Sequence, residues 1–337
     1  MNRNPLLKVD NLKTHFTTAS GIVKAVDGVT FSLDYGKTLG IVGESGCGKS
    51  VTAASIMRLL PKNGYIAGGE IMFESKNIAS LSEKEMLDIR GNEISMIFQD
   101  PMTSLDPVFT IGSQVMEVIN AHQKVPKEQA KEYAIKALKM VGIPEPEKRL
   151  KSYPHEFSGG MRQRVIIAMA IACNPKLIIA DEPTTALDVT VQAQVLGLMK
   201  DLQKETDASI ILVTHNLGVV WKMCDSVMVM YAGKTVEYAE VKTLYSDARH
   251  PYTWGLLRSM PKVTDNPDVP LASIPGTPPD LKLTGGSCNF NNRCKYCQKI
   301  CRMKCPEMKE VEPGHFVACH FTKTELEQIG GGRYAGE

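Results

Sequence analysis

Gly-Glu-Ser-Gly-Cys-Gly-Lys-Ser, residues 43–50, has the complete spacing of a phosphate-binding loop. It follows residues 38–42, a predicted buried strand, and precedes residues 51–60, a predicted helix, which is the context the loop requires. Glycines allow backbone N–H groups and the positive helix end to face phosphates. Lys49 is predicted to neutralise the β and γ phosphates, and Ser50 to bind Mg²⁺. The stretch predicts ATP binding by Gly43, Glu44, Ser45, Gly46, Cys47, Gly48, Lys49, Ser50 and Val51.

A second apolar stretch, residues 176–182, ends in two carboxylates and is predicted to be a strand. Asp181 suits the metal shell of a bound Mg-nucleotide, through water, and Glu182 suits the position of a base that polarises the attacking water. Isolated acids of this kind would more simply cap a helix, but the upstream loop favours the nucleotide interpretation. A further strand, residues 209–214, delivers His215 to the same end of the sheet. A lone histidine after a strand is more often a structural residue, and only together with the other motifs is His215 assigned to contact the γ-phosphate.

Strand and helix patterns alternate from residue 5 to about 245, with a mainly helical stretch from about 100 to 170. They predict an α/β core with an inserted helical lobe. Early antiparallel strands are expected at residues 6–16, 23–33 and 69–74. We place an ATP-binding domain at 1–250 and a C-terminal extension at 251–337, with a proline-rich linker at 266–279.

Composition is that of an ordinary globular protein: 337 residues, 43% hydrophobic, 23% charged and a net charge of +2. This near-neutral charge implies no polyanionic partner. Residues 1–10 lack the apolar core of an export signal, and no apolar run approaches the roughly twenty residues that span a bilayer. If a membrane is involved, another chain supplies the spanning segments.

Six of the nine cysteines lie within residues 288–319. In a chain without an export signal, such clustering favours metal ligation over disulfides, because cytosolic thiols stay reduced. The spacing is loosely that of an iron–sulfur site, with a four-thiolate zinc site and unligated thiols as alternatives. We expect loops rather than helices to carry the ligands, and the metal to organise a segment too small to bury its own core.

Together the motifs resemble the ATPase subunits of ABC transporters. Gln99, residues 158–163, Asp181-Glu182, residues 186–188 and His215 occur in the order of that family's Q-loop, signature, Walker B motif, D-loop and H-loop. The resemblance implies a P-loop fold with a RecA-like core, an antiparallel β subdomain and a helical subdomain. It implies catalytic roles for Glu182, His215 and Gln99, with Mg²⁺ held through Ser50, Gln99 and Asp181.

The signature of this family covers the ATP bound by a partner subunit, so that two nucleotides lie in a head-to-tail dimer. By resemblance, the residues that reach the partner's ATP are Ser158, Gly159, Gly160, Met161 and Asp188. Met161 replaces the usual glutamine, and Val51 replaces the threonine that often follows the loop serine; backbone contacts survive both changes. Phe16 matches the aromatic residue that stacks on adenine, although an amphipathic strand would also place a phenylalanine in the core.

Further segments resemble the oligopeptide, dipeptide and nickel importer group in particular: residues 97–107, 153–157, 250–253 and 274–278. In that group the segment after Gln99 helps form the groove for a coupling helix of the membrane subunit. The group's C-terminal cysteine pattern implies a [4Fe–4S] cluster, or alternatively Zn²⁺, with the ligands Cys288, Cys294, Cys301 and Cys319 and the additional cysteines Cys297 and Cys305.

The resemblance implies an ATP-hydrolysing subunit that powers peptide uptake by dimer closure, with nickel or another small solute as the alternative cargo. Its implied partners are a second, non-identical ATPase subunit, two membrane permease subunits and an extracytoplasmic solute-binding protein. It would lie peripherally at the cytoplasmic face of the membrane. A soluble ABC ATPase acting on nucleic acid is the rival, against which the near-neutral charge argues. A redox-sensing tail is compatible with transport.

Overall fold

The computed structural model describes residues 4–99, 104–185, 187–261 and 273–330. The chain divides into two compact parts, which we describe separately. The first part comprises residues 1–7, 33–38 and 73–213, and the second comprises residues 8–32, 39–72 and 214–337. Both parts combine helices with sheet strands, so the predicted α/β class is confirmed. Among the described residues, no helix is both long enough and apolar enough to cross a membrane.

Three parallel strands form the sheet of the first part: β6 (Ile94–Ile97), β7 (Leu177–Asp181) and β8 (Ser209–Thr214). Ile179 in the middle strand pairs with Met96 on one side and with Ile211 on the other. Every residue of β7 and β8 is buried, as expected for parallel strands covered on both faces. The predicted strand therefore ends at Asp181, and Glu182 follows it.

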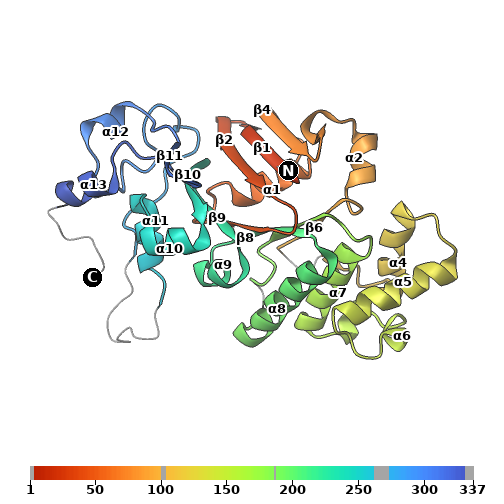
Figure 1. Ribbon diagram of the computed structural model, residues 1–337. Coiled ribbons are helices and arrows are strands. Elements are labelled where there is room, and N and C mark those ends of the chain that lie inside the picture. Colours follow the sequence, from red (N-terminus) through yellow and green to blue (C-terminus); the bar gives the residue numbers. More distant parts are fainter. Residues whose placement is uncertain (1–3, 100–103, 186, 262–272, 331–337) are drawn as a thin grey trace. The chain divides into compact units, whose positions relative to one another are not determined.

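The predicted helical lobe is present between residues 104 and 171 (Figure 1). Helix α5 (Lys127–Met140) begins after Pro126 and ends two residues before Gly142. Gly142 has φ +71°, the left-handed conformation that commonly ends helices. The helices of the first part are α2 (Glu83–Ile89), α4 (Ile111–His122), α5 (Lys127–Met140), α6 (Pro146–Arg149), α7 (Gly159–Ile171) and α8 (Val189–Thr206), with short 3₁₀ turns at Ile78–Ser80 and Pro154–Glu156 and the two-residue strand β5 (Lys76–Asn77).

Two sets of strands build the second part. In the first set, β1 (Leu7–Thr18) lies between β2 (Gly21–Leu33) and β4 (Gly64–Phe73). In the second set, β9 pairs in parallel with β3 and antiparallel with β10, and β12 of the tail continues the antiparallel series. The strands of this set are β3 (Thr38–Val42), β9 (Ser226–Tyr231), β10 (Lys234–Glu240), β12 (His315–Val317) and β11 (Lys309–Glu312).

Helices of the second part are α1 (Lys49–Ile56), α9 (Leu217–Met223), α10 (Val241–Asp247), α11 (Pro251–Arg258), α12 (Lys299–Met303) and α13 (Lys323–Ile329). Our expectation that loops alone carry the clustered cysteines was wrong for Cys301, which is buried within α12. This helix has only five residues, too few for a recognisable helical repeat of apolar side chains. The proline-rich linker lies partly in residues 262–272, outside the described residues.

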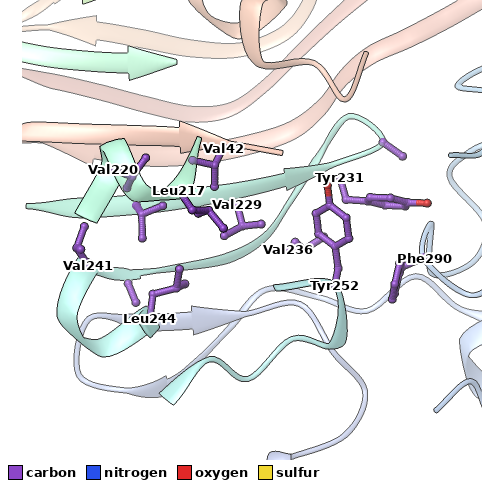
Figure 2. Close-up of a cluster of buried hydrophobic side chains, with 13 residues drawn as sticks. Val42, Leu217, Val220, Val229, Tyr231, Val236, Val241, Leu244, Tyr252 and Phe290 are labelled. Atoms are coloured by element: carbon purple, nitrogen blue, oxygen red, sulfur yellow. The ribbon is translucent and has the colours of Figure 1, made fainter. Parts of the chain in front are cut away.

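A hydrophobic cluster joins the C-terminal segment to the strands of the second part (Figure 2). Phe290 from the tail packs against Tyr231 of β9 and Tyr252 of α11, with ring centroids 5.2 Å and 5.4 Å away. The two tyrosine rings are themselves 4.6 Å apart. Aromatic trios of this kind contribute more than their buried area alone. The tail segment around Phe290 is therefore packed into the core of the second part.

Protonation of His250 should destabilise this core. The residue is 2% exposed and caps α11, where its Nδ1 accepts a hydrogen bond from the Tyr252 N–H. Burial lowers the pKa of His250 to about 4. Since the unfolded chain binds the proton more readily, stability is complete above about pH 6.5 and falls towards pH 4. Between pH 7 and pH 5 the free energy of unfolding should drop by about 2 kcal/mol from this residue.

Urea unfolding of the wild type and of His250→Asn at both pH values measures this contribution. Asparagine is a favourable N-cap without a titrating ring, so the variant should lose about 2 kcal/mol less than the wild type between pH 7 and pH 5. Equal losses in the two proteins would show that His250 does not titrate on unfolding.

Candidate nucleotide and cysteine sites

The predicted phosphate-binding loop connects β3 to α1 in the second part, as expected. Two of its glycines are required by their surroundings. A Cβ atom on Gly43 would lie 2.2 Å from the Met230 carbonyl oxygen, and one on Gly48 would lie 2.4 Å from the Ala25 carbonyl oxygen. Both have positive φ, +154° and +109°, which L side chains rarely adopt. The loop backbone can follow this path only with glycine at these positions.

Lys49 lies at the start of α1 and is only 5% exposed. Its Nζ donates to the carbonyl oxygens of Gly43 and Glu44, at 2.9 Å and 3.1 Å. Ser45, Gly46 and Ser50 are exposed. A buried ammonium beside exposed loop atoms can bind the phosphate groups of a nucleotide.

Glu44 is held by two residues that the sequence did not single out as site residues. Its backbone N–H donates to the Tyr252 hydroxyl at 2.9 Å. Its carboxylate receives two hydrogen bonds from the Arg293 guanidinium, at 2.6 Å and 2.9 Å. Tyr252 lies in the importer-like segment at residues 250–253, and Arg293 precedes the implied ligand Cys294. Neither position indicates Glu44 as its partner.

Two other predicted residues also belong to the second part. His215 is exposed and directly follows β8. Phe16 is partly buried near the end of β1, where its ring lies against Gly64. A Cβ at that glycine would approach Phe16 to 2.7 Å. The position allows both interpretations of Phe16, as an adenine-stacking ring and as a packing residue of its sheet.

In the first part, Glu182 contacts Gln99, a pairing that the sequence did not predict. The Gln99 amide donates to the Glu182 carboxylate at 3.3 Å, and the Thr185 hydroxyl donates to the same oxygen at 2.8 Å. Glu182 has φ +48°, and such backbone strain in a residue other than glycine is concentrated at functional sites. Its N–H is fixed by the Val213 carbonyl. Thr185 was missed because a lone threonine carries no motif. Asp181, at the end of β7, is buried.

The signature and D-loop lie side by side in the first part. Ser158 caps α7, its hydroxyl accepting from the Met161 N–H at 3.3 Å, and Asp188 caps α8, accepting from the Val191 N–H at 2.9 Å. Ser158 and Gly159 are exposed. A Cβ on Gly160 would lie 2.6 Å from the Val191 side chain, so glycine allows the two helix starts to approach. Residues 100–103 of the predicted docking groove and Ala186 of the D-loop lie outside the described residues.

Four of the clustered thiols lie close enough together to affect one another's pKa. Burial, and after it the thiols of Cys301, Cys294 and Cys319, raise the pKa of Cys288 to about 12. The pKa of Cys294 is also raised to about 12, by burial and then by Cys319, Cys301 and Cys297. The residues Cys288, Cys294, Cys301 and Cys319 are the four implied ligands. They therefore form one neighbourhood, in which a bound metal would replace the thiol protons.

Within the described ranges, no three cysteine sulfurs lie all within 4.8 Å of one another. This finding does not separate the two metal alternatives, so the iron–sulfur cluster and the four-thiolate zinc site both stay predictions for this neighbourhood.

One oxygen- and nitrogen-rich group in the described chain has metal-like spacing: Asp247, Glu312 and His315. Its charges are already paired. Lys323 contacts Asp247 at 2.7 Å, Arg249 contacts both Asp247 and Glu312, and His315 contacts the buried Glu237 at 2.8 Å. The group forms a network of ion pairs that connects the tail to β10 and α10.

Two family descriptions match the chain. "ABC transporter" matches residues 26–185, and "Oligopeptide/dipeptide transporter, C-terminal region" matches residues 236–301. The second range contains Tyr252, Arg293 and three of the four implied ligands.

Curated relatives match along most of their length. The chain is 56% identical to the oligopeptide transport ATP-binding protein OppD of Bacillus subtilis, over 93% of this chain and 87% of the relative. It is 51% identical to the dipeptide transport ATP-binding protein DppD of the same organism, over 93% and 94%. The OppD of Salmonella typhimurium is 49% identical over 96% of both chains.

Solved structures of similar fold include the ATP-binding cassette MJ0796 as a dimer in a post-hydrolysis state with ADP and phosphate. It has a TM-score of 0.62 and 27% identity, covering 70% of this chain and 98% of that one. A second is cbiO1 of Clostridium perfringens, described as part of the transporter complex cbiONQ, with a TM-score of 0.62 and 28% identity, covering 72% and 92%.

Proposed function

The chain belongs to the family of oligopeptide and dipeptide transport ATP-binding proteins, and from this we propose that it hydrolyses ATP to drive the import of short peptides. The observation that carries the proposal is the 56% identity to a peptide-transport ATP-binding protein over 93% of the chain. The match of residues 236–301 to the family's C-terminal region supports it separately. Family membership confirms the predicted ABC ATPase fold and its enzymatic class.

In the proposed reaction, ATP binds with its phosphates on the loop of residues 43–50 and with Mg²⁺ on Ser50, Gln99 and Asp181. Glu182 orients and polarises the attacking water, and its hydrogen bonds from Gln99 and Thr185 fix the carboxylate. His215 contacts the γ-phosphate.

The proposed working unit is a head-to-tail pair of ATPase subunits, in which Ser158, Gly159, Gly160, Met161 and Asp188 cover the partner's ATP. The exposed positions of Ser158 and Gly159 at the start of α7 support this role. The pair would bind two permease subunits at the cytoplasmic face of the membrane, with an extracytoplasmic solute-binding protein delivering peptide. Closure of the pair on ATP moves the permeases, and hydrolysis reopens them.

We also propose that Cys288, Cys294, Cys301 and Cys319 hold a [4Fe–4S] cluster. Their mutual proximity supports it. The cluster would connect segments far apart in the tail. Cys297, which acts on the pKa of Cys294, is an additional thiol beside it, and Cys305 is the second additional cysteine of the predicted pattern. Zinc is the alternative.

Protein purified without oxygen should contain iron and acid-labile sulfide in near-stoichiometric amounts, with a broad visible absorbance that bleaches on reduction. The Cys288→Ser and Cys301→Ser variants should lose both, while Cys173→Ser, in the first part, should keep them. Bound zinc without visible absorbance would show that the site is a structural zinc site and not an iron–sulfur cluster. Absence of both iron and zinc would reject the metal proposal.

Peptide uptake tests the proposed cargo. The gene should restore growth on a dipeptide or tripeptide as the source of a required amino acid, in cells that lack their own subunit and carry the matching permeases. A Lys49→Ala version should fail to do so. Restored nickel accumulation without restored peptide growth would assign the motor to the alternative cargo.

A further inference from the structure

We propose that Arg293, in the cysteine-bearing tail, is a positioning residue for ATP: it holds the phosphate-binding loop through Glu44, so that ATP affinity depends on the state of the cysteine site. The inference rests on the proposed ATPase function for its readout. Each contact that carries it lies within the second part of the chain.

The Arg293–Glu44 contact is a bidentate ion pair with little exposure to water. The Arg293 side chain is 4% exposed and that of Glu44 is 28% exposed. Both terminal nitrogens of the guanidinium contact the carboxylate, at 2.6 Å and 2.9 Å. Paired geometry of this kind is strong and directional. The tail therefore fixes the second residue of the loop in one orientation.

The rest of the guanidinium is also fixed. Its Nε donates to the Pro275 carbonyl at 2.9 Å, and its terminal nitrogens reach the Ile274 carbonyl at 3.1 Å and the Tyr231 hydroxyl at 3.3 Å. Gly276, with φ +78°, lets the chain turn beside the arginine stem. A side chain with every nitrogen engaged can transmit a displacement of its own backbone to Glu44.

Glu44 is in turn linked to the residue that binds phosphate. Its N–H is held by Tyr252, and its carbonyl receives Lys49 Nζ at 3.1 Å. Movement of Glu44 would therefore change the placement of the lysine ammonium. A shift of this kind alters nucleotide affinity, because charge-assisted phosphate contacts depend steeply on geometry.

The backbone of Arg293 belongs to the cysteine site. Cys294 is its neighbour in the chain, and the N–H groups of Arg293 and Cys294 both donate to the Phe290 carbonyl. The Cys288 N–H donates to the Cys301 carbonyl at 2.8 Å. Metal bound to Cys288, Cys294 and Cys301 would hold this segment in place, and metal loss would release it.

Replacement of Arg293 by alanine should weaken ATP binding by about tenfold, with kcat at saturating ATP changed by less than about twofold. Arg293→Lys, which keeps one charged contact, should recover part of the affinity. The matched control is Arg302→Ala, an exposed arginine beside Cys301, which should bind ATP as the wild type does. Titration of the full-length chain with a fluorescent ATP analogue measures the ATP affinity, and ATPase assays measure kcat. Unchanged affinity in Arg293→Ala would overturn the proposal.

The dependence on metal is tested with a paired variant. Wild-type protein oxidised with ferricyanide and treated with EDTA should lose ATP affinity about as much as Arg293→Ala does. The Glu44→Ala/Arg293→Ala variant should already bind weakly and respond little to the same treatment. An equal loss of ATP affinity in both proteins, or no loss in either, would show that the cysteine site does not act through the Arg293–Glu44 pair. If the protein does not restore peptide uptake but shows these changes in ATP affinity, the proposed cargo is wrong and the inference about Arg293 still holds.

Discussion

Glu182→Gln is expected to reduce steady-state ATP hydrolysis by at least about hundredfold while leaving ATP binding intact, because the amide keeps the shape of the carboxylate but cannot accept the proton of the attacking water. The Gln99 and Thr185 donors converge on one oxygen of Glu182, and a glutamine oxygen can replace it there. With hydrolysis blocked and ATP bound, the variant should accumulate as a closed pair in the presence of ATP.

ATPase assays and light scattering with and without ATP measure the two effects. Glu205→Gln, an exposed glutamate in α8, is the matched control and should turn over normally. Normal turnover in Glu182→Gln would remove Glu182 from the role of base, and lost ATP binding would show that its charge is needed for the nucleotide.

Lys49→Ala is expected to weaken ATP binding by about hundredfold and to abolish hydrolysis at cellular ATP concentrations. The ammonium is buried and aimed into the loop by the Gly43 and Glu44 carbonyls. Alanine removes the only lysine of the loop. The Gly43 and Glu44 carbonyl oxygens would then accept hydrogen bonds from other donors. The fold should persist, because α1 keeps the apolar contacts of Ala53 and Ile56, both fully buried.

Equilibrium binding of a fluorescent ATP analogue checks the loss, and thermal unfolding without nucleotide checks the fold. Lys62→Ala replaces an exposed lysine just beyond α1 and should retain ATP binding. Near-normal affinity in Lys49→Ala would mean that backbone N–H groups alone hold the phosphates.

Much of the fold follows from local sequence. The strand, glycine loop and helix around Lys49 are contiguous in the chain, so turn chemistry and the flanking patterns identify them. Strand β7 is a continuous apolar stretch, which its hydrophobic pattern identifies. The starts of α7 and α8 are also local features, because Ser158 and Asp188 are both strong N-cap residues. Even so, the sequence placed the start of the helix after the loop two residues late, at Val51 instead of Lys49.

Other features depend on contacts between distant residues. The ion pair from Glu44 to Arg293 joins residues 249 positions apart, and no local pattern specifies such a partner. Strand β12 has three residues, too few for alternation to be read. The strained backbone of Glu182 is also invisible in sequence, because nothing in an Asp-Glu-Pro string requires a left-handed glutamate.

The pairing of β12 with β10, through Glu237 and Val317 and through Tyr238 and Phe316, affects how the protein can be shortened. A truncation before β11 would remove the β12 partner of β10 while β9 stays paired on the other side. One edge of β10 would then be unpaired, and an unpaired strand edge is a template for aggregation. In the full chain the outermost strand is β11, whose four residues, Lys309–Glu312, are all exposed and include three charges, and short charged strands resist intermolecular pairing. The extension thus also protects solubility, and poor expression of a tail-less protein would say nothing about its chemistry.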